Sequence, residues 1–272
     1  MCLMACLAVG LALLPVGLAW ADPPRRLLIL GQGPDGHPAG THEYMAGARV
    51  MAACLQPVKE VQVIVAQADG LWREGPQALK DADGVVLFLS EGASWVDREP
   101  LRRQAFADFA ARGGGLVVLH WGMGTKAPEP IDRYLKLFGG CHGGPDRKYQ
   151  VVESTVTPAD PRHPITAGIV EFPVRDEFYY KLKFAKADRA VQPILRTPID
   201  GNAETIAWCW ERPDNGRSFG FSGLHFHENW KQEPYRRLMT QGILWSLKLP
   251  VPEKGINVQI PDKSYELQAT SP

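Results

Sequence analysis

The sequence predicts an α/β fold with a mostly parallel β-sheet flanked by helices and a β-rich extension in the second half. Three observations lead to this prediction. In the first half, short apolar segments alternate with amphipathic ones, which is the pattern of successive βαβ units. Several apolar segments are continuous, as expected for strands buried on both faces of a parallel sheet. In the second half, strand-like segments follow one another with few helical patterns between them.

The first twenty-one residues, Met1 to Ala21, are interpreted as a signal peptide. They carry no charged side chain, contain an apolar run and end in Ala19-Trp20-Ala21, a small-x-small cleavage pattern. The alternative is a membrane anchor, but the run is short for a bilayer span and contains glycine and proline. We therefore expect an exported protein, periplasmic or secreted, whose mature chain begins at Asp22 and has no membrane span.

In the first half, the expected strands are residues 26–30, 61–65, 84–89 and 116–119. Thr41 is the expected N-cap of a helix that extends to Leu55. Asp97 is the expected cap of a second helix, in which Leu101 and Phe109 face the core. Three glycines, residues 113–115, end this helix.

In the second half, residues 149–156, 191–196, 205–210 and 218–224 are expected to form an antiparallel extension of the sheet. A last helix is expected over residues 234–247. Residues 22–250 then form one domain, a length that a single α/β core commonly reaches. Residues 251–272 are polar, aperiodic and contain three prolines, which predicts a C-terminal tail.

Composition and missing motifs argue against several classes of function. Lysine plus arginine and aspartate plus glutamate balance at 30 each, so no general electrostatic attraction to nucleic acid is expected. The sequence has no P-loop. Residues 31–36 have the spacing GxGxxG, but the following helix begins too far from these glycines for a dinucleotide-binding turn, so neither NAD nor a nucleotide is expected as cofactor. Residues 216–220 have the spacing GxSxG, but Ser218 starts an expected strand and does not lie on a strand-to-helix turn, so no nucleophile elbow is expected.

Polar residues that could carry chemistry follow the predicted strands. Ligands of open α/β sheets bind beyond the carboxyl ends of the strands, so these residues are expected to gather at one edge. They are His37, His42, Glu91, His120, Trp121, His142, His225 and His227. One interpretation is a divalent metal site, with zinc expected first and with His42, His120 and His225 as ligands. The other is metal-free acid/base chemistry, in which Asp176 or Glu177 orients a histidine.

Two further patterns refine this hypothesis. His225 and His227 would project to the same side if their segment is extended, because strand side chains alternate. Trp121, Tyr179 and Trp230 could stack on sugar rings, whereas Trp208 and Trp210 share one face of a strand and are interpreted as core residues. A small-molecule carbohydrate is therefore the expected partner.

Several segments together resemble the ThuA-like (trehalose utilisation) domain family. They are residues 35–38 with 41–44, 113–120, 138–140, 163–166, 176–179, 216–225 and 234–245. The resemblance covers nearly all of residues 26–249. It implies a flavodoxin-like fold akin to class I glutamine amidotransferases, in which a catalytic cysteine sits on the turn after a central strand. Here His120 stands at that turn, so glutamine hydrolysis is not expected.

The resemblance also implies a link to trehalose, to other disaccharides and to glycosides oxidised to a 3-keto form. On this basis the expected catalytic residues are His42, His120, Glu177 and His225. The expected substrate-binding residues are His37, Glu91, Trp121, His142, Asp176, Tyr179, His227 and Trp230. Two alternatives to a carbohydrate-active lyase or hydrolase stay open: a non-catalytic carbohydrate-binding protein and an interaction module, which could form a homo-oligomer.

Overall fold

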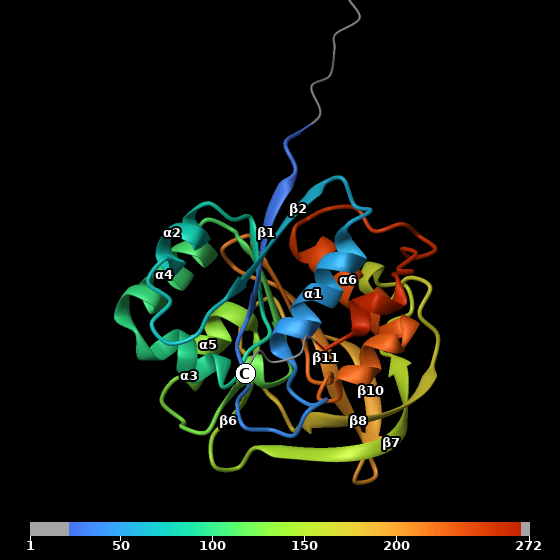
Figure 1. The fold of residues 1–272 in the computed structure, drawn as a ribbon. Coiled ribbons are helices and arrows are strands. Elements are labelled where there is room, and N and C mark those ends of the chain that lie inside the picture. Colours follow the sequence, from blue (N-terminus) through green and yellow to red (C-terminus); the bar gives the residue numbers. More distant parts are fainter. Residues whose placement is uncertain (1–21, 268–272) are drawn as a thin grey trace, which may run out of the picture.

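A computed structural model describes residues 22–267 of the chain (Figure 1). The signal peptide predicted over residues 1–21 therefore lies outside the described residues. The main sheet has nine strands in the order β2-β1-β3-β4-β12-β11-β10-β7-β8. Its first five strands are parallel and the remaining pairs are antiparallel. The predicted α/β fold with a β-rich second half is confirmed.

The parallel half positions most of the loops that matter below. Its strands are β2 (Val61–Gln67), β1 (Arg25–Gly31), β3 (Gly84–Leu87), β4 (Gly115–Leu119) and β12 (Arg217–Phe221). Their spatial order is the 2-1-3-4-5 order of flavodoxin-like folds. All five strands run in the same direction, so the loops that follow β1, β3, β4 and β12 meet at one edge of the sheet.

The antiparallel half consists of β11 (Asn202–Glu211), β10 (Gln192–Ile199), β7 (Lys148–Pro158) and β8 (Phe172–Tyr180). Strand β8 was not expected from the sequence. It pairs with β7 along its whole length, from Lys148 opposite Tyr180 to Val156 opposite Phe172. A small second sheet joins β5 (Gly124–Thr125), β6 (Gly140–Gly143) and β9 (Lys183–Phe184).

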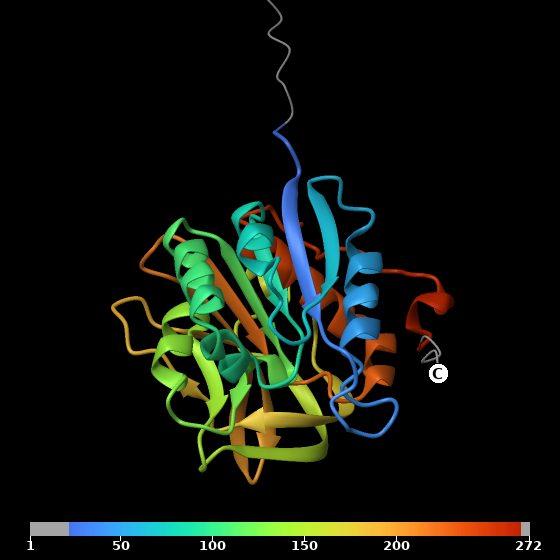
Figure 2. The same cartoon turned by 60° about the vertical axis from the view of Figure 1, so that its left-hand side comes forward.

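Helices cover both faces of the parallel half, as Figure 2 shows. One face carries α1 (Tyr44–Leu55) and α6 (Glu233–Ser246), and the other carries α2 (Gly75–Lys80), α3 (Gly92–Arg98), α4 (Pro100–Ala111) and α5 (Ile131–Phe138). Successive side chains of β1 point to opposite faces of the sheet. Leu27 and Ile29 pack in the core beneath α1 and α6, and Leu28 and Leu30 pack in the core on the other face.

Two local expectations are wrong. Thr41 does not cap α1; it forms an isolated bridge with Phe226, and Glu43 holds the N-cap position. Asp97 does not cap the helix that contains Leu101 and Phe109, because it lies within α3. Glu99 holds the N-cap position of α4 and is extended before Pro100, as residues that precede proline commonly are. The helix that starts at Pro100 turns Leu101 toward solvent, where it is 78% exposed.

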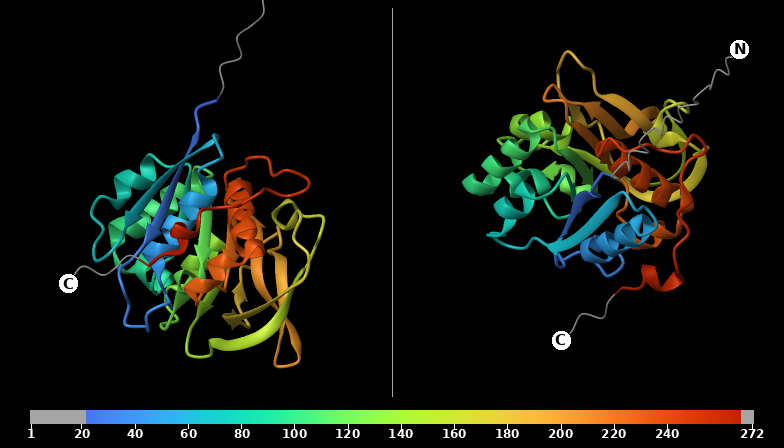
Figure 3. Two further views of the ribbon diagram at one scale, coloured as in Figure 1. Left: turned by 45° about the vertical axis from the view of Figure 1, so that its right-hand side comes forward. Right: turned by 90° about the horizontal axis from the view of Figure 1, so that it is seen from above.

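The end of the described chain lies against the domain, beside α1 and α6 (Figure 3). The amide of Ile256 donates to the Gln241 side chain, and Val258 is buried. A short 3-10 helix, η4 (Asp262–Tyr265), follows and contacts η3 (His227–Lys231). Within residues 22–267, no helix has the length and hydropathy needed to cross a membrane.

Candidate metal centre

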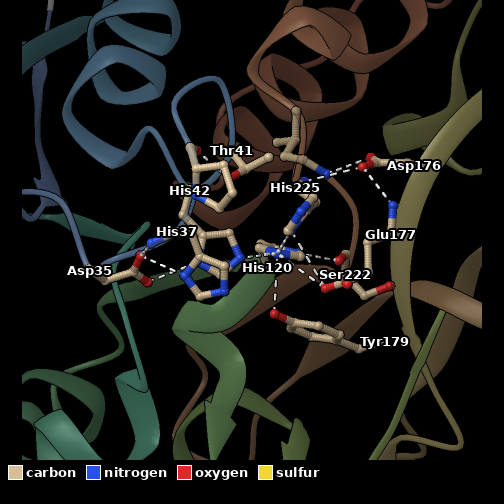
Figure 4. A network of polar contacts seen from close by, with 12 residues as sticks. Asp35, His37, Thr41, His42, His120, Asp176, Glu177, Tyr179, Ser222 and His225 are labelled. Carbon is tan, nitrogen blue, oxygen red and sulfur yellow. Dashed lines mark hydrogen bonds and ion pairs between the residues drawn. The ribbon is translucent and has the colours of Figure 1, made fainter. Parts of the chain in front are cut away.

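Four predicted residues converge at the carboxyl edge of the sheet (Figure 4). His42 comes from the loop after β1, His120 follows β4 directly, and His225 lies in the loop after β12. Glu177 comes from β8 in the antiparallel half. One ligand atom of each of these residues lies within 4.8 Å of the others, so the group could hold a metal ion.

The distances within this group are those of a closely packed ligand set. His42 Nε2 lies 3.0 Å from His120 Nε2, and His225 Nδ1 lies 3.3 Å from the same His120 atom. Glu177 Oε1 lies 3.5 Å from His225 Nδ1 and 3.9 Å from His120 Nε2. Three imidazole nitrogens and one carboxylate oxygen therefore face a common point.

The outward nitrogens of two of these rings are fixed by acceptors. His120 Nδ1 lies 2.8 Å from the carbonyl oxygen of Ser222 and therefore donates to it. His42 Nδ1 lies 2.8 Å from Asp35 Oδ2, a carboxylate that also accepts from the Tyr44 hydroxyl. With Nδ1 protonated, each Nε2 carries a lone pair that points into the cluster. This is the arrangement by which proteins orient metal-binding histidines.

The backbone around the cluster is conformationally unusual. His42 and His120 have φ values of 52° and 45°, and Leu224, directly before His225, has φ of 75°. L-residues rarely adopt the left-handed region, and each instance costs on the order of 1–3 kcal/mol. Left-handed residues at three of the convergent loops indicate that packing holds these side chains in place against a local backbone preference.

Burial favours the neutral form of two histidines of the cluster, His120 and His225. It lowers the pKa of His120 well below its ordinary value and that of His225 to about 4, and the neighbouring histidines add to both shifts. Burial raises the pKa of Glu177 to about 7, with a further contribution from Asp176. Burial alone would raise the pKa of Asp35, but hydrogen bonds with His42, Tyr44 and His37 lower it well below its usual range.

Asp176 supports the cluster and does not face a ligand, contrary to the expectation that it binds substrate. Its side chain is fully buried. It accepts hydrogen bonds from the amides of Leu224 and His225, at 2.7 and 3.2 Å, and from the amide of Glu177 at 2.9 Å. The hydroxyl of Tyr235 in α6 also donates to it, at 3.0 Å. Asp176 therefore ties the loop of His225 to the strand of Glu177.

A pocket of about 190 Å³ opens beside the cluster. It is lined by His37, His42, Trp121, Lys126, His142, Arg147, Tyr149, Glu177 and Tyr179. Tyr179 stacks between His120 and His142, with ring centroids 4.5 and 4.0 Å away, and its hydroxyl lies 3.1 Å from His120 Nε2. Pockets for drug-sized ligands enclose roughly 300–1,000 Å³, so this one accommodates a small ligand or one ring of a larger one.

The other predicted site residues divide into two groups. Glu91 does not line the pocket itself, but its carboxylate pairs at 3.0 Å with Lys126, which does. His227 and Trp230 lie outside the pocket. His227 starts the 3-10 helix η3 and its Nε2 contacts the Tyr265 carbonyl oxygen at 2.9 Å, so it does not project with His225. Trp230 is buried in the core against Phe88.

Sequence reasoning missed five residues around the cluster and pocket: Asp35, Tyr44, Lys126, Arg147 and Tyr149. Asp35 could have been found, because it follows a predicted strand just as His37 and His42 do. Arg147 and Tyr149 gave no such signal, since they reach the pocket through the pairing of β7 with the unexpected strand β8.

The described cysteines do not supply a thiolate nucleophile. Cys54, Cys141 and Cys209 are free and buried, and burial raises the pKa of each thiol to about 12. Cys141 lies in β6, whereas the turn directly after β4 holds His120.

Comparison with solved structures finds proteins of similar fold. A ThuA-like protein from Bacteroides uniformis has a similar structure, with a TM-score of 0.64 and 15% identity over 84% of this chain and 93% of that one. A glutamine amidotransferase from Thermotoga maritima gives a TM-score of 0.43 and 12% identity, over 82% of this chain and 96% of that one. The glutaminase domain of Trypanosoma brucei CTPS gives a TM-score of 0.46 and 11% identity, over 87% of this chain and 100% of that one.

No curated protein matches the sequence. The sequence model of the ThuA family, described as "Trehalose utilisation", matches residues 36–246, which include all four residues of the cluster. The chain belongs to the ThuA family.

Proposed function

We propose that this protein is a metal-dependent enzyme that cleaves a carbohydrate, with a 3-keto-glycoside as the substrate class. The observation that carries the proposal is the convergence of His42, His120 and His225 on one point, with Glu177 beside them. The family description and the aromatic pocket next to the cluster support a carbohydrate as ligand. The predicted cleavage after Ala21 supports an exported enzyme.

The three histidines fit a zinc ion. In a tetrahedral site with Zn–N bonds of about 2.0–2.1 Å, ligand nitrogens lie about 3.3 Å apart. The contacts of His120 Nε2 with His42 Nε2 and with His225 Nδ1 measure 3.0 and 3.3 Å. Neutral imidazoles are ligands that zinc prefers. When bound, such an ion would act as a Lewis acid that polarises a carbonyl oxygen of the substrate.

The chain's own groups would move the protons. A 3-keto group acidifies the neighbouring C2–H, and Glu177 lines the pocket with a carboxylate that can accept this proton. As the C2–H bond breaks, its electrons form a C1=C2 double bond and the C1 substituent leaves with the electrons of the C1–O bond; Glu177 can return the proton to this leaving group, which completes the elimination. The Tyr179 hydroxyl lines the same pocket, and its pKa is raised well above the ordinary value by burial, so it stays a hydrogen-bond donor toward developing negative charge.

The proposal assigns metal binding to the three histidines and proton transfer to Glu177, and an experiment can distinguish these roles. The purified protein is analysed for metal by plasma mass spectrometry, and turnover is assayed on 3-keto-glycosides beside the unoxidised glycosides. We expect near-stoichiometric zinc and turnover of the keto substrates. His120→Ala should lose both, whereas Glu177→Gln should keep the metal and lose turnover.

Other outcomes would contradict the proposal. No metal, and none taken up on titration, would remove the Lewis-acid role. Saturable sugar binding that survives chelation, with no turnover of any substrate, would instead identify a carbohydrate-binding module on this fold.

A further inference from the structure

The pocket carries positive charge on the side formed by the segments after β4 and β6. Lys126 and Arg147 both line it. The Lys126 ammonium is compensated, since it lies 3.0 Å from the Glu91 carboxylate. The half-buried Arg147 side chain donates to the carbonyl of Gly144 at 3.2 Å, and no carboxylate of residues 22–267 pairs with its guanidinium. A guanidinium has five N–H donors, so most of those of Arg147 are available to a ligand.

A second, independent feature of the same wall points to a ligand. His142 is 2% exposed, yet its side chain lines the pocket and forms no hydrogen bond with any residue in the described part of the chain. Neither ring nitrogen of His142 belongs to the fully buried atoms that lack a partner, so both nitrogens are accessible from the pocket that the ring lines. Burial lowers the pKa of His142 to about 3, and the charges of Arg147 and Lys183 contribute, so the ring is neutral. It offers one donor and one acceptor to a ligand in the pocket.

Tyr149 completes this wall. Its side chain is 57% exposed, lines the pocket and stands edge-on to Tyr179, with ring centroids 6.4 Å apart. An exposed aromatic face beside a free guanidinium and an unpartnered imidazole suits a sugar ring that bears a charged substituent, because the ring packs on the aromatic surface while the charge meets the arginine.

We propose that Arg147, His142 and Tyr149 form a subsite for an oxyanion on the sugar ring, so that the substrates are acidic glycosides such as uronosides. The inference rests on the proposed function and names its substrate class. The planar guanidinium of Arg147 matches a carboxylate or sulfate with two parallel hydrogen bonds. His142 bonds a neighbouring hydroxyl. The small volume of the pocket restricts it to the one ring that carries the anion.

The test is calorimetric titration of the zinc-loaded protein with D-glucuronate, D-glucose and D-glucose 6-sulfate. We expect an acidic sugar to bind at least tenfold more tightly than glucose, and the tighter of the two acids identifies the anionic group. Arg147→Gln should weaken the binding of that acid by roughly ten- to a hundredfold, so that its affinity approaches that of glucose. Arg147→Lys, which keeps the charge without the planar fork, should give an intermediate loss.

Two controls make the result specific. Arg162→Gln removes the same charge from an arginine that is 92% exposed and does not line the pocket, and it should bind as the wild type does. A titration of metal-free protein separates an anion at Arg147 from one at the histidine cluster, because only the former binds without metal.

The inference and the proposed function can fail separately. Equal affinity for glucose and both acids, or an acid preference that survives Arg147→Gln, would overturn the subsite, even if the protein binds zinc and cleaves neutral glycosides. Conversely, an acid preference that depends on Arg147 in a protein that takes up no metal would support the subsite and contradict the metal-dependent enzyme.

Discussion

His42 Nε2 and His120 Nε2 lie 3.0 Å apart, although the Nδ1 atom of each ring is already held by an acceptor. Both facing nitrogens therefore carry lone pairs when the rings are neutral, and two lone pairs at this distance repel unless a cation lies between them. His225 Nδ1 approaches the same point. A cation between these nitrogens would relieve the repulsion, and we therefore expect metal binding to stabilise the fold.

The first prediction concerns thermal stability. A metal that binds only the folded protein adds about 4 kcal/mol at a thousandfold excess over its Kd. For a domain of this size, each kcal/mol added to the free energy of unfolding raises the melting temperature by about 2–4 °C. Zinc should therefore raise Tm by roughly 8–16 °C. Calorimetry of chelator-treated protein, with and without added zinc, measures the shift.

The same experiment on two variants locates the effect. His42→Ala should lose most of the zinc-dependent shift. His163→Asn changes a histidine remote from the cluster, beside Cys209 and Trp245, and should keep the whole shift. An equal shift in both variants would place the bound metal somewhere other than the cluster.

Asp35 gives a second prediction, which tests orientation without removing a ligand. Its carboxylate accepts a hydrogen bond from His42 Nδ1 at 2.8 Å and so fixes the orientation of the ring. Loss of such a partner typically weakens metal binding about 10–100-fold. Asp35→Asn should therefore raise the zinc Kd by that factor in a competition assay with a fluorescent chelator.

Asp83→Asn is the matched control for Asp35→Asn. Asp83 accepts the Arg26 amide at the start of β1, at the opposite end of the strand from the cluster. The zinc Kd of this variant should equal that of the wild type. A wild-type Kd in Asp35→Asn as well would show that the His42 ring needs no carboxylate partner.

The sequence predicts the parallel half of the fold well, because its strands are uninterrupted apolar runs between clear glycine and helix signals. It also predicts that His42, His120 and His225 share one edge, since each follows a strand of the same parallel sheet. Strand β8 was missed for a physical reason. Its buried positions alternate from Phe172 to Phe178, but one of them is Asp176, whose charge breaks the apolar pattern.

The errors in the site also have local causes. His227 does not follow His225 along an extended segment, because Leu224 is left-handed and a 3-10 helix begins at His227. Arg147 and Tyr149 enter the pocket only through long-range pairing of β7 with β8, which no local pattern reports. Periodicity identifies elements, whereas the contents of a pocket depend on how distant elements pair.

A third prediction concerns pH and His163. Burial lowers the pKa of His163 in the folded state below its ordinary value of 6.5, and Asp160, Glu211 and Arg217 modify the shift. The unfolded chain therefore binds the proton first. The stability that neutral His163 provides is complete above pH 6.5 and is lost as the pH falls from there toward the folded pKa.

His163→Asn tests this effect with little change in structure. His163 Nδ1 accepts the Ile165 amide at 3.1 Å as the N-cap of a 3-10 turn, and asparagine is a good N-cap that does not titrate. Urea unfolding at pH 7.5 and 5.5 should show a larger loss of stability at the lower pH in the wild type than in the variant. If the wild type and the variant lost equal stability between pH 7.5 and 5.5, His163 would have the same pKa in the folded and the unfolded state.

The last prediction separates positioning from packing at Asp176. This buried carboxylate accepts the amides of Glu177, Leu224 and His225 as well as the Tyr235 hydroxyl. Asp176→Asn replaces an acceptor oxygen with an NH₂ group and leaves buried amides unpaired, at about 1–3 kcal/mol for each group left unsatisfied. Because these amides set the positions of Glu177 and His225, zinc affinity should fall together with stability.

Tyr235→Phe is the discriminating partner of Asp176→Asn. It removes one hydrogen bond to the same carboxylate, worth about 0.5–1.5 kcal/mol, but leaves the three amide contacts of Asp176 intact. Its zinc content and zinc Kd should be those of the wild type, despite the lower free energy of unfolding. If both variants lost stability and neither lost zinc affinity, Asp176 would act only as a packing element between β8 and α6, and the position of His225 would depend on its other contacts.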